Sequence, residues 1–76
     1  MIEIYDTNNK QIKCEFLFTF TKDNKNFVVY KDQEDDILSS YYKEEDNKLI
    51  IMPITDEEDY DLVDIEIAKW WNQNEE

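Results

Sequence analysis

The sequence predicts an α+β domain in which an antiparallel meander of about five strands carries one C-terminal helix packed on one face. Three observations predict this class. Residues 2–54 contain short β-rich segments separated by polar clusters that suit turns. The stretch from Ile12 to Phe20 alternates apolar and polar residues, as a strand with one buried face does. After Pro53 the apolar residues recur at helical spacing, so residues 1–76 form one domain with its helix last.

The expected strands follow one another with short turns between them. Ile2 and Ile4 open the chain, and Asn8-Asn9 is the expected first hairpin turn. The later strands are expected at 11–21, 27–30, 37–42 and 49–52, and Pro53 ends the last because it has no N–H for the ladder. The chain has no glycine, so positive φ angles must fall on asparagine or aspartate. Four consecutive β-formers at 27–30 suggest a strand with contacts on both faces.

The second of these strands holds the largest apolar concentration in the chain. Only Leu17 breaks its alternation. The residues expected to share one face are Ile12, Cys14, Phe16, Phe18 and Phe20. Because buried aromatic rings dominate the energy of small cores, we expect the core to form on this face.

The helix is expected over about 56–72. Thr55 and Glu58 fit a capping box, and the acids of the first turn suit the positive end of the helix dipole. The apolar stripe expected to cover the sheet consists of Tyr60, Val63, Ile67 and Trp71, with Trp70 at its edge.

Composition and charge exclude several classes of function. Twenty acidic residues and eight lysines give a formal charge of −12, which repels nucleic acid and anionic membranes. We therefore expect a basic or neutral protein partner, with no direct nucleic-acid binding and no membrane binding. One cysteine and no histidine exclude an internal disulfide and an ordinary zinc site, and no cofactor is expected. The acidic start and the lack of a long apolar run favour a cytoplasmic protein.

The order of these segments resembles that of the YrzB-like family, small acidic bacterial domains of unknown function. The segments that carry the resemblance are Ile2-Glu3-Ile4, Leu17-Phe18-Thr19-Phe20, Phe27-Val28-Val29-Tyr30, the acidic loop 32–36, the strand 49–54 and the acidic segment 56–63. Family members usually carry glycine in the first two turns and a plain acidic tail, where this chain has asparagines and the pair Trp70-Trp71. The resemblance implies the same fold and no catalytic residues. The family's genes often lie near one for a Holliday-junction-resolvase-like protein, so it also implies a partner that handles nucleic acid.

Three possible reactive or metal sites have simpler structural interpretations. Cys14 is expected on the same face of the strand as the phenylalanines, because it lies an even number of residues from them. A buried cysteine behaves as a small apolar residue. Ser39-Ser40 has no histidine to activate it as a nucleophile. The segment from Asp32 to Asp36 is similar to the start of a calcium loop, but it has Ile37 where that loop needs glycine.

The helix is the most acidic part of the chain and the expected contact surface. Leu62 and Ile65 lie opposite the predicted stripe, among further acids, so they should face away from the sheet. Trp70 is the expected contact residue outside the core, because tryptophan is enriched at binding hot spots. The predicted protein-binding residues are therefore Leu62, Ile65, Trp70, Asp61, Asp64 and Glu66. These residues are expected to contact either a partner protein or a second copy of the chain. The protein is accordingly expected to be a monomer or a weak homodimer.

Three classes of function are left. The first is a non-catalytic acidic module that binds a basic or nucleic-acid-handling protein. The second is a DNA mimic whose carboxylates occupy the groove of a nuclease or another nucleic-acid-binding protein. The third is a small enzyme, which we do not expect because the chain has no histidine, arginine or glycine-rich phosphate loop.

Overall fold

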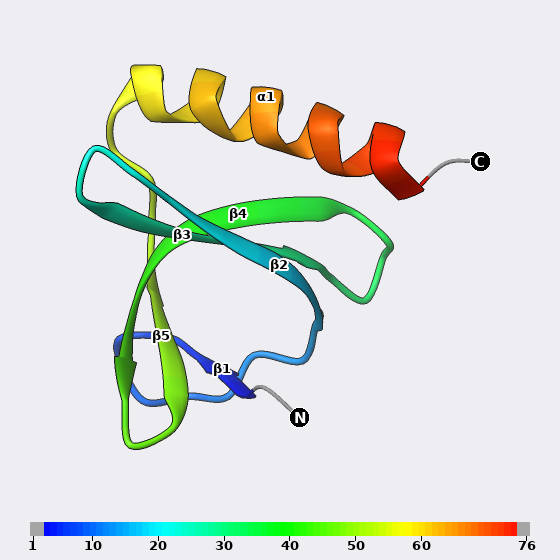
Figure 1. Ribbon diagram of the computed structural model, residues 1–76. Helices are drawn as coiled ribbons and strands as arrows, with labels where there is room; N and C mark the ends of the chain where they lie inside the picture. Colours follow the sequence, from blue (N-terminus) through cyan, green and yellow to red (C-terminus); the bar gives the residue numbers. More distant parts are fainter. Residues whose placement is uncertain (1–2, 75–76) are drawn as a thin grey trace.

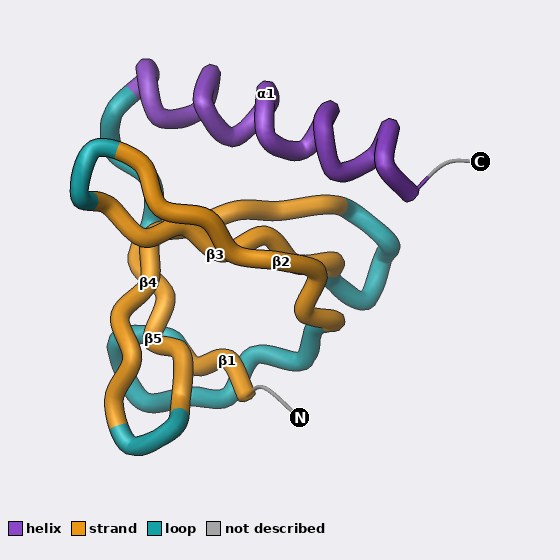
Figure 2. Tube along the Cα trace, viewed as in Figure 1, coloured by secondary structure: helices purple, strands orange, loops and turns teal. Residues whose placement is uncertain are grey.

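The computed structural model, which describes residues 3–74, confirms the α+β class with one C-terminal helix. The elements are β1 (Glu3–Tyr5), β2 (Glu15–Lys22), β3 (Lys25–Lys31), β4 (Ile37–Glu45), β5 (Lys48–Met52) and α1 (Glu57–Asn74) (Figure 1). They form a mostly antiparallel five-stranded sheet in the order β1-β5-β4-β3-β2. The helix lies over β2, β3 and β4, while β1 and β5 extend away from it (Figure 2).

The first strand is placed differently from the predicted meander. It does not form a hairpin with β2 but pairs in parallel with β5, with Ile4 opposite Leu49. A single bridge between Tyr5 and Gln11, and a 2.8 Å hydrogen bond from the Ile12 N–H to the Ile4 carbonyl, join it to the chain before β2. Ile4 and Leu49 are both buried in one cluster, so this pairing brings apolar side chains of the two strands together on one face of the sheet.

The phenylalanines of β2 do not share one face, so that prediction is wrong. Phe16 pairs with Tyr30 and Phe18 pairs with Val29, which places a bulge at Leu17. A bulge reverses the side-chain alternation beyond it. Residues before and after the bulge consequently belong to two cores on opposite faces of the sheet.

These two cores share β3, which is buried on both faces as predicted. The core on the face away from the helix is built on Ile4, Val28, Tyr30 and Leu49, with Ile12, Cys14 and Phe16 packed against it. The core beneath the helix is built on Phe27, Ile54 and Val63, with Phe20, Tyr41 and Ile67 packed against it. Phe27, Val28 and Val29 are fully buried, and Phe20 stacks on Phe27 with ring centroids 4.6 Å apart.

Asparagine and aspartate carry every positive φ angle among residues 3–74, as the absence of glycine predicts. The two-residue turns Asp23-Asn24 and Asp46-Asn47 have positive φ at both positions, which is the geometry that joins twisted antiparallel strands. Asn9 and Asp35 supply the remaining left-handed positions in two longer loops.

Those two loops, residues 6–10 and 32–36, have the same hydrogen-bond pattern. In each, the first aspartate accepts backbone N–H groups from the residues two and four positions later, at 2.9 Å. Backbone bonds between the first and last residues, and from the fourth N–H to the first carbonyl, complete both loops. The carboxylate of Asp32 thus folds its own backbone, which supports the simple loop interpretation of residues 32–36.

The helix is rotated relative to the predicted stripe. It begins at Glu57, so Asp56 and not Thr55 immediately precedes it. Val63 is buried as expected, but Tyr60 and Trp71 are about half exposed, and Asp59 is buried in their place. At 100° per residue, the buried side is displaced by about 60° around the helix axis.

Candidate functional site

The buried acid of the helix is part of a charged cluster that joins α1 to the sheet. Lys25, at the start of β3, donates to Oδ2 of Asp59 at 2.9 Å and to Oδ2 of Asp56 at 3.1 Å. The Tyr41 hydroxyl of β4 donates to the same oxygen of Asp59 at 2.5 Å. Since a buried carboxylate without partners is strongly unfavourable, these contacts fix the rotation of the helix.

The cluster keeps its ionic form near neutral pH. The Tyr41 hydroxyl and then the Lys25 ammonium hold the pKa of Asp59 below its ordinary value of 3.8. Hydrogen bonds to Asp59 and Asp56 raise the pKa of Lys25 above its ordinary value of 10.5. One ammonium and two carboxylates therefore leave one net negative charge, and the lysine is already occupied by its two partners.

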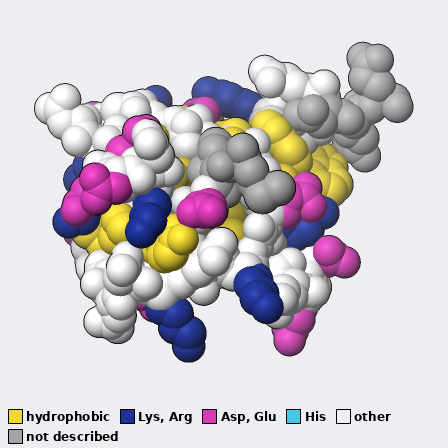
Figure 3. Space-filling view, turned by 90° about the horizontal axis from the view of Figure 1, so that it is seen from below, with side chains coloured by type: hydrophobic (Ala, Val, Ile, Leu, Met, Phe, Trp, Pro, Cys, Tyr) yellow, Lys and Arg dark blue, Asp and Glu magenta, His cyan; other side chains and the backbone are white. Residues whose placement is uncertain are grey.

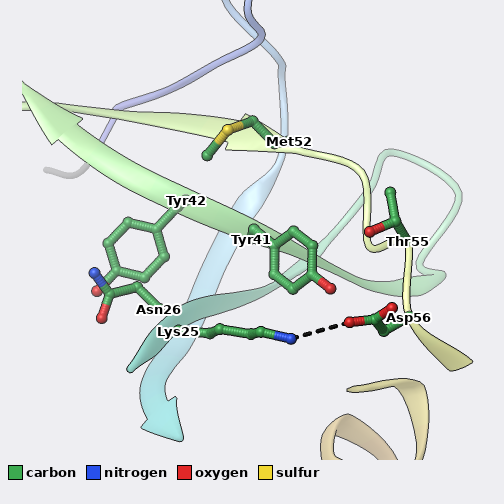
Figure 4. A pocket seen from close by; sticks show the side chains of 7 residues that line it. All are labelled: Lys25, Asn26, Tyr41, Tyr42, Met52, Thr55 and Asp56. Atoms are coloured by element: carbon green, nitrogen blue, oxygen red, sulfur yellow. Dashed lines mark hydrogen bonds and ion pairs between the residues drawn. The ribbon is translucent and has the colours of Figure 1, made fainter. Parts of the chain in front are cut away.

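Beside this cluster lies a hollow of about 360 Å³ that we call the tyrosine hollow. Its lining residues are Lys25, Asn26, Tyr41, Tyr42, Met52, Thr55 and Asp56 (Figure 4). Figure 4 shows the two tyrosine rings between Met52 and Lys25 in this view, with Asp56 at the end reached by the lysine ammonium. Tyr41 packs against the core beneath the helix and Tyr42 against the core on the opposite face, so the two rings meet the hollow from different sides of the sheet. The Lys25 ammonium lies 5.8 Å from the centroid of the Tyr41 ring, so the hollow already holds a cation beside its carboxylate.

The predicted contact residues of the helix fall into two groups. Asp61, Asp64 and Ile65 are exposed as expected, and the side chain of Ile65 is 52% exposed. Leu62 is only partly exposed and does not face fully away from the sheet, which corrects the expectation.

Glu66 and Trp70 also lie closer to the sheet than predicted. The side chain of Glu66 is 24% exposed and accepts a hydrogen bond from Lys69 at 3.3 Å. Trp70 stacks on Phe18 of β2, with ring centroids 5.5 Å apart, so it is part of the packing between helix and sheet. The structure therefore does not bring all six predicted residues onto one exposed surface.

Two aromatic residues that the sequence assigned to the core are exposed instead. Tyr60 is 51% exposed and Trp71 is 50% exposed. Together with the exposed acids and Ile65 they form what we call the outer face of α1, which consists of Tyr60, Asp61, Asp64, Ile65, Ala68 and Trp71. No pattern within the helix identifies the exposure of Tyr60 and Trp71, because it depends on the contacts of Asp59 with Lys25 and Tyr41 of the sheet.

The other candidate residues have structural roles. Cys14 is partly buried, and burial raises the pKa of its thiol, which disfavours the reactive thiolate. Ser40 is buried and shares a 3.1 Å hydrogen bond with the Tyr30 hydroxyl. Within residues 3–74, no three cysteine, aspartate or glutamate side chains are grouped closely enough to hold a metal ion. The helix of this described part lacks the apolar length needed to cross a membrane.

Comparison with known proteins identifies one family. A family model described as a protein of unknown function, DUF1292, matches residues 7–72. No curated protein and no solved structure matches the chain.

Proposed function

The chain belongs to the DUF1292 family of proteins of unknown function, and we propose that it is a non-catalytic module whose helix binds a basic protein. Within that family we place it nearest the YrzB-like members, as a cytoplasmic bacterial protein. The observation that carries the proposal is the outer face of α1, where three large apolar side chains stand among carboxylates.

The distribution of charge supports a binding role for the helix. Residues 55–74 carry seven acids and one lysine, a net charge of −6 out of −10 for residues 3–74. The face of the molecule opposite the helix shows lysine and acidic side chains interspersed (Figure 3). A basic partner is therefore attracted most strongly to the helix side. Such complementarity increases the association rate and disfavours acidic partners.

The apolar residues of the outer face are the proposed source of binding affinity, which surface charges alone do not provide. Exposed ion pairs each contribute at most about 1 kcal/mol, so carboxylates alone give weak, salt-sensitive binding. Tyr60, Ile65 and Trp71 each leave about half of their surface in water. Tyrosine and tryptophan are enriched among residues that dominate binding energy, so these side chains are the proposed source of affinity.

The test compares proteins retained from a cell lysate by matched variants. Asp61→Asn with Asp64→Asn removes two charges from the outer face, and Tyr60→Ser with Ile65→Ser removes apolar surface. The control, Glu34→Gln with Glu44→Gln, removes two exposed charges elsewhere. We expect one basic protein to be retained by the wild type and the control, and lost with either outer-face variant.

Salt and competitor DNA separate the alternatives. Retention that decreases with salt and is displaced by DNA indicates the DNA-mimic form of the proposal, in which the partner is a nuclease or another nucleic-acid-binding protein. Retention unaffected by DNA indicates an ordinary protein interface. Equal retention by the wild type and both outer-face variants contradicts the proposal.

A further inference from the structure

The two edges of the sheet differ in how they are protected. β1, at one edge, has three residues, and its Ile4 carbonyl already accepts a hydrogen bond from the Ile12 N–H. β2, at the other edge, has eight residues and pairs only with β3 within the described part of the chain. Proteins often protect a long edge with proline, a bulge or a covering segment, because its unpaired backbone groups can pair with another strand. Beyond the bulge at Leu17, residues 18–22 contain neither proline nor a further bulge.

The turn after β2 determines which backbone groups point to this free side. The two-residue turn at 23–24 has positive φ at both positions, so Lys22 and Lys25 form the first hydrogen-bonded pair of the hairpin. Hydrogen-bonded and non-hydrogen-bonded pairs alternate along antiparallel strands. Thr19 and Thr21 therefore direct their N–H and C=O groups away from β3, where no other described backbone group bonds to them.

The side chains of this segment differ between the two faces of the sheet. Phe18 stacks on Trp70 of α1, and Phe20 packs into the core beneath the helix. Thr19 and Thr21 have exposed side chains on the opposite face. Threonine pairs well with threonine across antiparallel strands, so the exposed face of this edge suits a second copy of the same strand.

From these observations we propose that β2 pairs with β2 of a second copy, antiparallel about a two-fold axis at Phe20. In this register Thr19 of each copy lies opposite Thr21 of the other, and each pair exchanges both of its N–H···O bonds. The bulge at Leu17 stays outside the paired segment, and the two sheets become one continuous sheet with an isologous interface. The inference is independent of the proposed function, because the outer face of α1 takes no part in the pairing.

Charge complementarity supports a second copy as the occupant. Lys22 is exposed and makes no ion pair with a described residue. The pairing places it opposite Phe18 of the other copy, where an ammonium gains a cation–π interaction with the aromatic rings. Residues 55–74 above these rings carry seven acids against one lysine, which also favours a cation. Each copy supplies the lysine that the other receives, so the interface is self-complementary.

Repulsion between the two acidic helices is weakened by distance. Each helix packs on the core residue Phe27 of β3, so β2 of both copies lies between the two helices. Spacings of about 4.8 Å between β3, both copies of β2 and the second β3 separate the helices by about 14 Å, more than a helix diameter of about 10–12 Å. The Debye length is about 8 Å at physiological salt, so this repulsion is screened and decreases further as salt is added.

The experiment measures the mass of the full chain by sedimentation equilibrium, from micromolar to millimolar concentration. We expect a monomer at low concentration and a rise toward twice that mass at high concentration, with a larger rise at higher salt. Amide hydrogen exchange locates the contact. Exchange at Thr19 and Thr21 should slow about twofold when half of the chains are paired, whereas exchange at the exposed Thr7 should not change.

Matched variants test the register. Thr19→Lys with Thr21→Lys, and Thr19→Glu with Thr21→Glu, each place like charges opposite one another, so each variant alone should stay monomeric. An equimolar mixture places lysine opposite glutamate and should form a heterodimer, which also shows that both variants remain folded. The control, Thr7→Lys with Gln33→Lys, adds the same charge in two exposed loops and should dimerise at least as strongly as the wild type.

Several results overturn the inference. These are a wild-type monomer under all of these conditions, a dimer of the lysine or glutamate variant alone, and no association in their mixture. A dimer lost with Tyr60→Ser and Ile65→Ser but kept with the lysine variant would place the contact on the outer face of α1 instead. Slower exchange at Thr19 and Thr21 only in the presence of a captured protein would also overturn it, and would assign this edge to an extended segment of that protein.

Discussion

The rotation of the helix is tested by truncating two residues that lie on different sides of it. Val63 is 2% exposed and packs with Phe27 and Ile54, whereas Ile65 is 52% exposed on the outer face. Val63→Ala removes both buried methyl groups, each worth about 0.8 kcal/mol, and leaves a cavity. The expected loss is about 2–3 kcal/mol. Ile65→Ala removes exposed carbons and gains helix propensity, so its effect should stay within about 0.5 kcal/mol.

The assay is urea denaturation followed by circular dichroism. A domain of 76 residues has a total stability of about 4–11 kcal/mol, so the loss from Val63→Ala is easily measured. The slope of the transition should be unchanged in both variants, since neither alters the surface exposed on unfolding by much. Equal losses, or a larger loss from Ile65→Ala, would show that the helix is rotated away from the position described.

Three further predictions concern the charged cluster, a turn and the thiol. The contribution of Asp59 to stability should be fully present above its ordinary pKa of 3.8 and lost as pH falls through its lowered pKa. The stability gap between the wild type and Asp59→Asn should therefore narrow below about pH 4 in urea titrations, and a constant gap would refute the ionic role. Asn47 has φ 67°, so Asn47→Ala should cost about 1 kcal/mol while Asn47→Gly should not; equal midpoints for the two variants would contradict this. Cys14 should react with a disulfide reagent more slowly in the folded than in the urea-unfolded chain, and equal rates would show that the thiol is not shielded.

Local features were largely predictable from the sequence. The strands of the meander, their turns and the helix all follow from patterns within a few residues of one another. The clearest case is the set of left-handed turn positions, which fall on asparagine and aspartate because glycine is absent. The burial of Val28 and Val29 on opposite faces of β3 likewise follows from four consecutive β-formers.

Features set by distant parts of the chain were not predictable in the same way. The parallel pairing of β1 with β5 brings together residues more than 40 positions apart, and no local pattern encodes it. The bulge at Leu17 was visible only as one break in the alternation, and that break did not show that Phe16 and Phe18 would face opposite sides.

The site was predicted in part. The exposed acids Asp61 and Asp64 and the exposure of Ile65 follow from helical spacing. The rotation of the helix does not follow from helical spacing, because a hydrophobic pattern predicts that every acidic residue is exposed to water. Asp59 is buried by Lys25 and Tyr41, residues of two other elements, and this contact also creates the margin of the tyrosine hollow.

The most direct test of the outer face as a binding surface is photocrosslinking inside cells. A photoreactive phenylalanine analogue replaces Tyr60 or Trp71 on the outer face, or Leu38 on β4, which is 41% exposed, as a control outside the helix. The account predicts that positions 60 and 71 crosslink to the same basic protein and that position 38 does not. Crosslinks from position 38 alone, or no adduct from either helix position, would contradict it.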